Sequence, residues 1–436
     1  MKPLIFAAAV LALLSTGAHA RPILSDSQKS YALVCLENRE PAERMAAICE
    51  VAVADAGVGP VDLRNIKVVL ADAYDALGRT EHALSLLDDV LAQAPAHTKA
   101  LNSLGWVHWS QDNFEAAVAA FDRSVDSGAT AQGLAGLASA RRLAGTIDED
   151  TYIQLIDAAI AMSPEYTWAM REKAWFLIDK GQFVAAEQPL WAAMEVDDAD
   201  PWTLYALGLA LFRQDKYYPA LAQLNEAIAT GDAPTVAYLF RARAHFSVEN
   251  YRAAMVDAER ITQDWPEDPD GPVWKARSLA ALGLRPAGIT VLRTYLQDAE
   301  SGFASYWLAS LLHDADEVDA AIDILRQNME SDAADYYDHE LMALLRFEND
   351  QHAQARVHIA AALALDPDAQ YPLYYEALIE VSDRNYEDAE ALFLDALAKG
   401  LPRRHIQGFI GALTEAGALD RAGAFRRKAD AVVSDN

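Results

Sequence analysis

The residues with the strongest metal-binding pattern lie in the segment HELMA, which begins at His339. This segment has the first histidine and the glutamate of a zinc-binding helix, but Ala343 occupies the position of the second histidine. Acidic runs near Asp197, Asp264 and Asp314 lack the ligand spacing of a calcium loop. The sequence contains no glycine-rich phosphate loop, no G-x-S-x-G and no C-x-x-C. It therefore predicts no catalytic centre, no metal site and no cofactor, and a protein that is not an enzyme.

The sequence contains two cysteines, Cys35 and Cys49, in segments that we expect to form two short helices around a turn at residues 38–41. Residues 1–20 have one early positive charge, a short apolar run and an Ala-x-Ala ending. This pattern is typical of a secretory signal peptide, so the mature chain is expected to be exported to a periplasm or secreted. In an oxidising compartment we expect a Cys35–Cys49 disulfide that staples the hairpin. Two buried free thiols are the alternative.

The chain is strongly acidic, with a formal net charge of −29 and an isoelectric point near 4.6. Such a surface repels nucleic acids and anionic lipid headgroups, so neither is expected as a partner. No later stretch is apolar enough to span a bilayer, and no membrane insertion is expected after signal cleavage. The same charge favours basic partners.

The elements that would position any binding residues follow a repeat. Small residues recur mostly every 34 positions, at Ala71, Gly105, Ala138, Ala174, Gly208, Ala242, Ala276, Ala309, Ala343, Ala377 and Gly411. A second series of small residues follows twelve positions later and includes Ala83, Ala117, Ala220, Gly288 and Gly423. Two phased series of this period indicate an array of paired helices.

One unit shows how the pairing works. Small residues allow two helices to cross closely, and larger side chains such as Leu70 and Leu87 fill the space beside the crossing. Gly78 separates the two helices, and Pro95 ends the second because proline lacks the amide hydrogen. A single hairpin cannot bury its apolar face, so the units are expected to stack.

The pattern Leu-Ala-x2-Tyr from Leu70, followed by Ala83-x3-Leu87 and Pro95, resembles the tetratricopeptide repeat (TPR). The resemblance extends over residues 64–434, about eleven units. It implies an all-α, right-handed superhelical solenoid of antiparallel helix pairs over residues 61–436, closed by a polar C-terminal capping repeat. Residues 21–60 are expected to form the N-terminal hairpin cap. The unit at 131–165 departs most, because Tyr152 replaces the small residue of its second helix.

In this family the first helix of each unit lines the concave side of the superhelix. The positions that would face this groove are rich in aromatic residues and arginine, a composition typical of recognition surfaces. The predicted ligand-binding residues are Trp106, Trp109, Trp168, Arg171, Trp175, Trp202, Tyr205, Arg243, Trp274, Arg277, Tyr306, Trp307 and Tyr374. The alternative is that these side chains pack on one another inside the protein. Asn102 is the one residue that matches the family's carboxylate clamp, and adjacent units lack its basic partners.

Together these features predict an exported scaffold that binds peptide segments or partner proteins, basic or aromatic-rich, in an aromatic-lined groove. A second hypothesis is binding of polysaccharide chains during envelope glycan export or assembly, because aromatic faces also stack on sugars. The repeat occupies nearly the whole chain and leaves no room for a separate catalytic domain.

Overall fold

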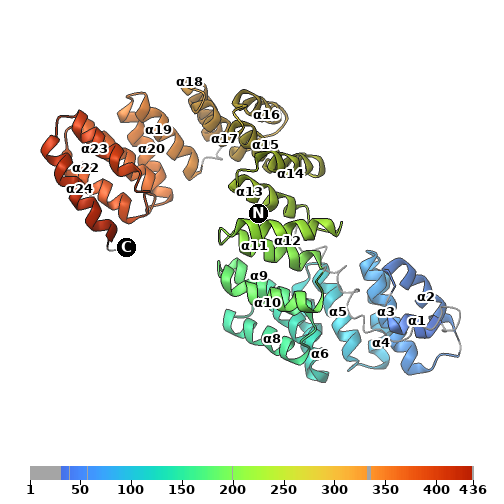
Figure 1. Ribbon diagram of the computed structural model, residues 1–436. Helices are drawn as coiled ribbons and strands as arrows, with labels where there is room; N and C mark the ends of the chain where they lie inside the picture. Colours follow the sequence, from blue (N-terminus) through green and yellow to red (C-terminus); the bar gives the residue numbers. More distant parts are fainter. Residues whose placement is uncertain (1–30, 39, 56, 199, 331–334, 435–436) are drawn as a thin grey trace. The chain divides into compact units, whose positions relative to one another are not determined.

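The computed structural model describes residues 31–38, 40–55, 57–198, 200–330 and 335–434. The predicted signal peptide at residues 1–20 lies outside these residues. Within them the fold is entirely α-helical, with 24 helices (Figure 1). The chain forms two compact units, one up to Ala237 and one from Tyr238, and each unit is described by itself. No helix among the described residues is long and apolar enough to cross a membrane.

The first unit contains α1 (Tyr31–Glu37), α2 (Ala42–Ala54), α3 (Pro60–Ala76), α4 (Thr80–Gln93), α5 (Thr98–Ser110), α6 (Phe114–Gly128), α7 (Ala131–Leu143), α8 (Glu149–Met162), α9 (Thr167–Asp179), α10 (Phe183–Val196), α11 (Pro201–Phe212) and α12 (Tyr217–Ala229). Helix α13 (Val236–Ser247) begins at the boundary. The second unit continues with α14 (Tyr251–Asp264), α15 (Asp270–Ala281), α16 (Arg285–Asp298), α17 (Gly302–His313), α18 (Val318–Glu330), α19 (Tyr336–Glu348), α20 (His352–Leu365), α21 (Gln370–Ser382), α22 (Tyr386–Ala398), α23 (His405–Glu415) and α24 (Leu419–Ser434).

The helices follow the predicted repeat. Among the described residues, α3 to α24 make eleven successive pairs, as the sequence predicted. Helices α4, α8, α14 and α20 each end two residues before a proline, at Pro95, Pro164, Pro266 and Pro367. The local signals therefore set both the number of pairs and the ends of these second helices.

The turn within each pair depends on one residue in the left-handed region. Gly78 has a φ of 71°, and Arg79 N–H donates to Tyr74 O at 2.8 Å, the bond that closes a Schellman cap. Asp112 and Asp215 adopt the same conformation, with φ values of 57° and 58°. The position recurs every 33 to 36 residues along the array, so the turn is a property of the repeat even where glycine is replaced.

Small residues allow the helices to approach closely. Phe121 on α6 is fully buried, and a Cβ atom added at Gly105 on α5 would lie 2.6 Å from its ring. Gly136 on α7 contacts the same ring, so one phenylalanine fills the space between three helices. This packing confirms the structural role predicted for the small-residue series.

The odd-numbered helices form the inner layer of each unit. Helix α5 packs against α3 and α7, and α19 packs against α17 and α21. Among the described even-numbered helices, only α22 and α24 have comparably extensive contact with each other. A stack in which the odd-numbered helices approach more closely is concave on their side. We call the solvent side of the odd-numbered helices the inner face.

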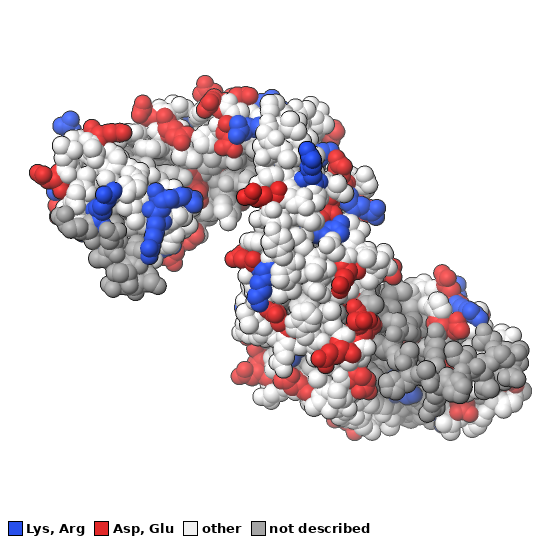
Figure 2. All heavy atoms as spheres, viewed as in Figure 1, with Lys and Arg blue, Asp and Glu red and all other residues white. Residues whose placement is uncertain are grey.

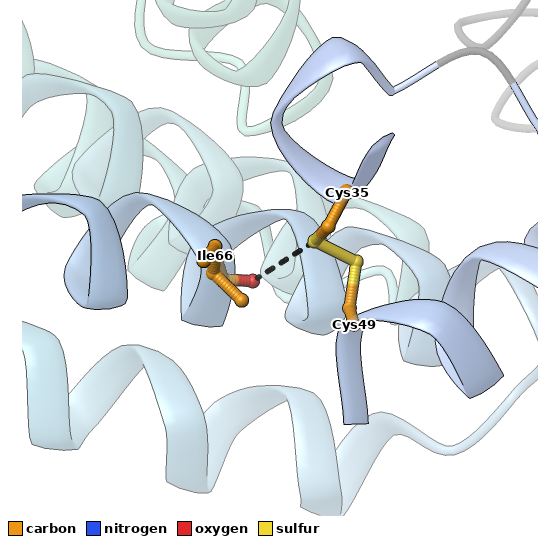
Figure 3. Close-up of a disulfide and its surroundings, with 3 residues drawn as sticks. All are labelled: Cys35, Cys49 and Ile66. Carbon is orange, nitrogen blue, oxygen red and sulfur yellow. Dashed lines mark hydrogen bonds between the residues drawn. A yellow bond between two sulfur atoms is a disulfide. The ribbon is translucent and has the colours of Figure 1, made fainter. Parts of the chain in front are cut away.

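The predicted N-terminal hairpin is present as α1 and α2, joined at Asn38, which has a φ of 47°. Cys35 and Cys49 form a disulfide between these helices, and both residues are fully buried. Cys35 Sγ lies 4.0 Å from the carbonyl oxygen of Ile66 on α3 (Figure 3). Closing a loop of this length stabilises the folded state by about 3 kcal/mol, so the disulfide fixes the hairpin as a cap on α3.

The last pair combines an aromatic core with a charged outer side. Phe393, Phe409 and Phe425 are fully buried and contact one another, with ring centroids of Phe393 and Phe409 4.3 Å apart. Lys428 Nζ donates to Glu390 Oε2 at 2.7 Å on the outside of this core. Phe393 and Glu390 lie on α22, so these contacts join the last pair to the preceding one, and the polar capping repeat stays a prediction. The side chain of Arg427, which suggested the cap, lies outside the described residues.

Candidate functional site

The histidine of the HELMA segment contacts another histidine in the structure. His339 Nδ1 on α19 lies 3.1 Å from His358 Nδ1 on α20. Among the described residues, no group of three or more histidine, cysteine or carboxylate side chains could hold a metal ion. Burial lowers the pKa of His358 to about 4, with further lowering from His339 and Arg346. Burial also lowers the pKa of His339.

Because His358 is half-buried beside His339, we expect the stability of the second unit to fall in acid. The folded-state pKa of His358 is about 4, below the value of about 6.5 in an unfolded chain, so its contribution to stability is complete above pH 6.5 and is lost as the pH falls to 4. We expect His358→Gln to remove about 2 kcal/mol of that pH dependence, after allowance for solvent screening. Urea unfolding at pH 4.5 and 7.5 measures the change. His82→Gln in the first unit is the control, and an equal effect of both variants would contradict the prediction.

Several predicted ligand-binding residues of the first unit are buried in the inner layer. Trp109, Trp168 and Tyr205 are 4%, 6% and 2% exposed. The ring centroid of Trp106 lies 4.8 Å from that of Trp168 and 5.2 Å from that of Phe121, in edge-to-face contact. For these buried rings the structure corresponds to the packing alternative, because a ligand would find little of their surface exposed.

Arg171 also has an internal partner. Its Nη1 donates to Asp200 Oδ2 at 2.5 Å, and both side chains are almost completely buried. Asp200 is the N-cap of α11 and accepts from Thr203 N at 2.9 Å. The guanidinium therefore joins α9 to the start of α11, and we assign it a structural role.

The inner face of the first unit retains three partly exposed tryptophans: Trp106, Trp175 and Trp202. The ring centroid of Trp175 lies 5.5 Å from that of buried Tyr205. The partly exposed rings of Trp106 and Trp175 thus pack against buried rings. Trp106, Trp175 and Trp202 remain the predicted contacts of a ligand in this unit.

Asn102 does not belong to a carboxylate clamp. Its Nδ2 donates to Thr130 Oγ1 at 3.0 Å, and its Oδ1 accepts from Ser124 Oγ at 2.5 Å. The side chain is 9% exposed. Its hydrogen bonds are used between neighbouring helices.

In the second unit, one aspartate holds two predicted site residues. Asp270 Oδ1, at the start of α15, accepts from Arg243 Nη2 at 3.1 Å and from Trp274 Nε1 at 3.2 Å. Trp274 is 8% exposed, whereas Arg243 is partly exposed. Asp270 therefore fixes the tryptophan ring and one cation at the edge of the inner face.

Arg277 on α15 occupies an unusual position between two of the predicted aromatic residues. Its Cζ lies 4.0 Å from the ring centroid of Trp274 and 3.8 Å from that of Trp307 on α17. The Phe246 ring is 4.9 Å away. The structure thus brings together Arg277, Trp274 and Trp307, three residues that the sequence assigned to one face.

A tyrosine-rich, acidic region adjoins this cluster. Tyr306, Trp307 and Tyr374 are partly exposed. Burial raises the pKa of Tyr306 to about 12, with a further increase from the Glu340 carboxylate on α19 and an opposite effect of Arg277. Tyr306 on α17 therefore lies within electrostatic range of a cation on α15 and of a carboxylate on α19.

The carboxylates that organise these residues were missed by the sequence analysis. Asp200 and Asp270 each begin a first helix, and Glu172 accepts from Ser139 Oγ at 3.2 Å and Tyr152 OH at 3.0 Å. Asp200 is the N-cap of α11 and Asp270 is the first residue of α15, and an aspartate at the start of a tryptophan-containing helix was a usable signal. The sequence held no such signal for the Glu172 contact, because this contact depends on Tyr152, which is buried in the irregular repeat at residues 131–165.

The cavities described in the structure lie away from the predicted residues. A cavity of about 590 Å³ is lined by Thr262, Lys275 and Tyr295 on α14 to α16. A smaller cavity of about 270 Å³ lies beside Arg142 and Tyr152 in the repeat at residues 131–165. The candidate site is accordingly an open face rather than an enclosed pocket. Figure 2 shows acidic side chains dispersed over the surface in view.

Comparison with known proteins agrees with the helical repeat. A family model described as tetratricopeptide repeat matches residues 68–132. Yeast Tom70 is 14% identical, with a TM-score of 0.50 over 91% of this chain and 96% of that one. PilF of Pseudomonas aeruginosa is 16% identical, with a TM-score of 0.44 over 49% of this chain and 97% of that one.

YrrB, described as a TPR protein with an unusual peptide-binding site, is 18% identical, with a TM-score of 0.31 over 45% of this chain and 96% of that one. No curated protein matches the sequence significantly. The likeness to Tom70 extends over almost the whole chain and shows the fold alone.

Proposed function

We propose that this chain, a tetratricopeptide-repeat protein, is an exported, non-enzymatic scaffold that binds peptide segments of partner proteins on its inner face. The observation that carries the proposal is the inner face of the second unit. There, Tyr306, Trp307 and Tyr374 stay partly exposed. Tyr374 packs against the buried rings of Tyr375 and Phe393, and the Trp307 ring lies beside the Arg277 guanidinium. Exposed aromatic side chains on rigid helices are effective anchors because little conformational entropy is lost on binding.

The expected ligand is an extended segment with aromatic and basic residues. Tyr306, Trp307 and Tyr374 offer ring faces for aromatic side chains, and Glu340 offers a carboxylate to a cation. The net charge of −29 favours basic segments at longer range.

Export is part of the proposal. The Cys35–Cys49 disulfide supports it, because structural disulfides persist mainly in oxidising compartments. The test is mass spectrometry of the protein isolated from its native cell without reductant. We expect a chain that begins at Arg21 and carries the disulfide; a reduced chain that retains residues 1–20 would contradict export.

Photo-crosslinking in the native cell tests the binding face. The crosslinker p-benzoylphenylalanine replaces Tyr374 or Trp307 on the inner face, or Val357 on α20 as the control. Val357 is 65% exposed and lies on an even-numbered helix. We expect protease-sensitive adducts from both inner positions and none from Val357.

Each other outcome of that experiment is decisive. Adducts that resist proteases but are removed by glycosidases would show that the ligand is a polysaccharide chain and would contradict peptide binding. No adduct at either inner position would contradict binding on this face. For a peptide identified by crosslinking, Trp307→Ala is expected to weaken binding at least tenfold in a calorimetric titration, as for other aromatic anchors.

A further inference from the structure

The Arg277 guanidinium is held by aromatic rings rather than by a carboxylate. At 4.0 and 3.8 Å from the Trp274 and Trp307 ring centroids, Cζ is at stacking distance from both rings. Rings of this kind cover the two faces of a guanidinium and leave the N–H groups along its edge for an acceptor.

No acidic side chain among the described residues lies within ion-pair distance of Arg277. Asp270, the aspartate of the cluster, accepts from Arg243 and Trp274. Arg241 of the same unit, by contrast, lies 2.6 Å from Asp257. A half-buried cation without a counter-ion is unfavourable, so Arg277 is electrostatically ready for an anion.

The surroundings intensify this positive potential. Burial lowers the pKa of Arg277 to about 10, with further lowering from the neighbouring Arg243. Arg277 therefore remains protonated at neutral pH, and no carboxylate among the described residues neutralises its positive charge. Two further N–H groups, Trp307 Nε1 and Arg243 Nε, are buried without a hydrogen-bond partner in the described structure. Unsatisfied donors of this kind are uncommon in folded proteins and indicate an absent acceptor.

We propose that Arg277, held between the Trp274 and Trp307 rings, forms an anion site that takes one carboxylate of a bound peptide. This inference rests on the proposed function and defines the ligand chemistry of the same face. The planar guanidinium edge matches the two oxygens of a carboxylate. The complete ligand would place a carboxylate at Arg277 on α15 and its aromatic or basic residues towards Glu340 on α19.

The test follows tryptophan indole N–H signals by two-dimensional NMR of the full ¹⁵N-labelled chain, which contains nine tryptophans. Trp307→Phe assigns the reporting signal. Probes are sodium acetate, the blocked peptide acetyl-Ala-Tyr-Asp-Ala-amide, its Asn analogue with an amide end, and that Asn analogue with a free C-terminal carboxylate. We expect acetate and both carboxylate peptides to shift the Trp307 signal, with at least tenfold tighter binding than the uncharged peptide. The two carboxylate peptides distinguish a side-chain source from a C-terminal one.

Arg277→Gln is expected to abolish the carboxylate-dependent shift, and Arg277→Lys to weaken it about tenfold because the bidentate geometry is lost. Arg326→Gln on α18 is the matched control, because it removes the same charge from an exposed side chain of the same unit. Equal binding of the charged and uncharged peptides to the natural chain would overturn the proposal, even if the Arg277 variants do not fold. An Arg277→Gln chain that titrates like the natural one would also overturn it.

The two proposals can fail separately. If cells yield no peptide adduct on the inner face, the acetate titration still decides whether the anion site exists. If peptides bind equally well with and without a carboxylate, the proposed scaffold function is kept and the proposal of an anion site is wrong.

Discussion

Arg171→Ala is expected to destabilise the first unit by about 3–5 kcal/mol. The change leaves Asp200 buried without its cation, at the N-terminus of α11, where it accepts from Thr203 N. Breaking a buried ion pair costs more than the pair itself contributes, since the remaining charge cannot be solvated. Denaturant unfolding gives the free energy, and hydrogen exchange of α9 and α11 localises the loss.

Lys173→Ala is the matched control on the same helix. Lys173 Nζ contacts Asp157 at 2.7 Å, but the two side chains are 25% and 49% exposed, so the expected loss is below about 1 kcal/mol. The double variant Arg171→Met with Asp200→Asn should recover most of the stability, because no buried charge remains. If Arg171→Ala kept its stability and lost only partner binding, the ligand-contact role inferred from the sequence would be correct.

Gly288→Ala is expected to destabilise the second unit by about 3 kcal/mol. A Cβ atom at this position on α16 would lie 2.6 Å from the carbonyl oxygen of Ala276 on α15. The obstacle is backbone rather than the end of a flexible side chain, so the two helices would have to separate. Thermal unfolding combined with hydrogen exchange of α15 and α16 measures the effect.

Gly423→Ala provides the opposite expectation at the same repeat position. A Cβ atom there meets nothing within 4 Å, because Gly423 lies on the exposed side of the terminal helix α24. The helix propensity of alanine should then raise stability by up to about 1 kcal/mol. Similar losses of stability for the two variants would contradict the prediction, because they would show that close helix packing at Gly288 does not cause its loss.

The contrast between Gly288 and Gly423 shows the limit of the repeat pattern. Both belong to one series of small residues in the sequence, and the pattern assigns both the same role. The structure separates them, because only Gly288 has a neighbouring backbone at contact distance. A residue in the terminal pair keeps the spacing of the repeat although no neighbouring backbone makes a small residue necessary there.

The sequence by itself determined the helix pairs, their number, the turns and the hairpin at Cys35 and Cys49. These features depend on local chemistry: small residues at a fixed period, Pro95 after a helix, and Gly78 in the left-handed region. Only the tertiary structure decided which residues of the inner layer are available to a ligand. Arg171 and Arg277 occupy comparable faces in the sequence, yet one is paired with Asp200 and the other lies between two tryptophans. The reason is physical: burial and charge compensation depend on side chains supplied by neighbouring repeats, and helical periodicity does not encode those neighbours.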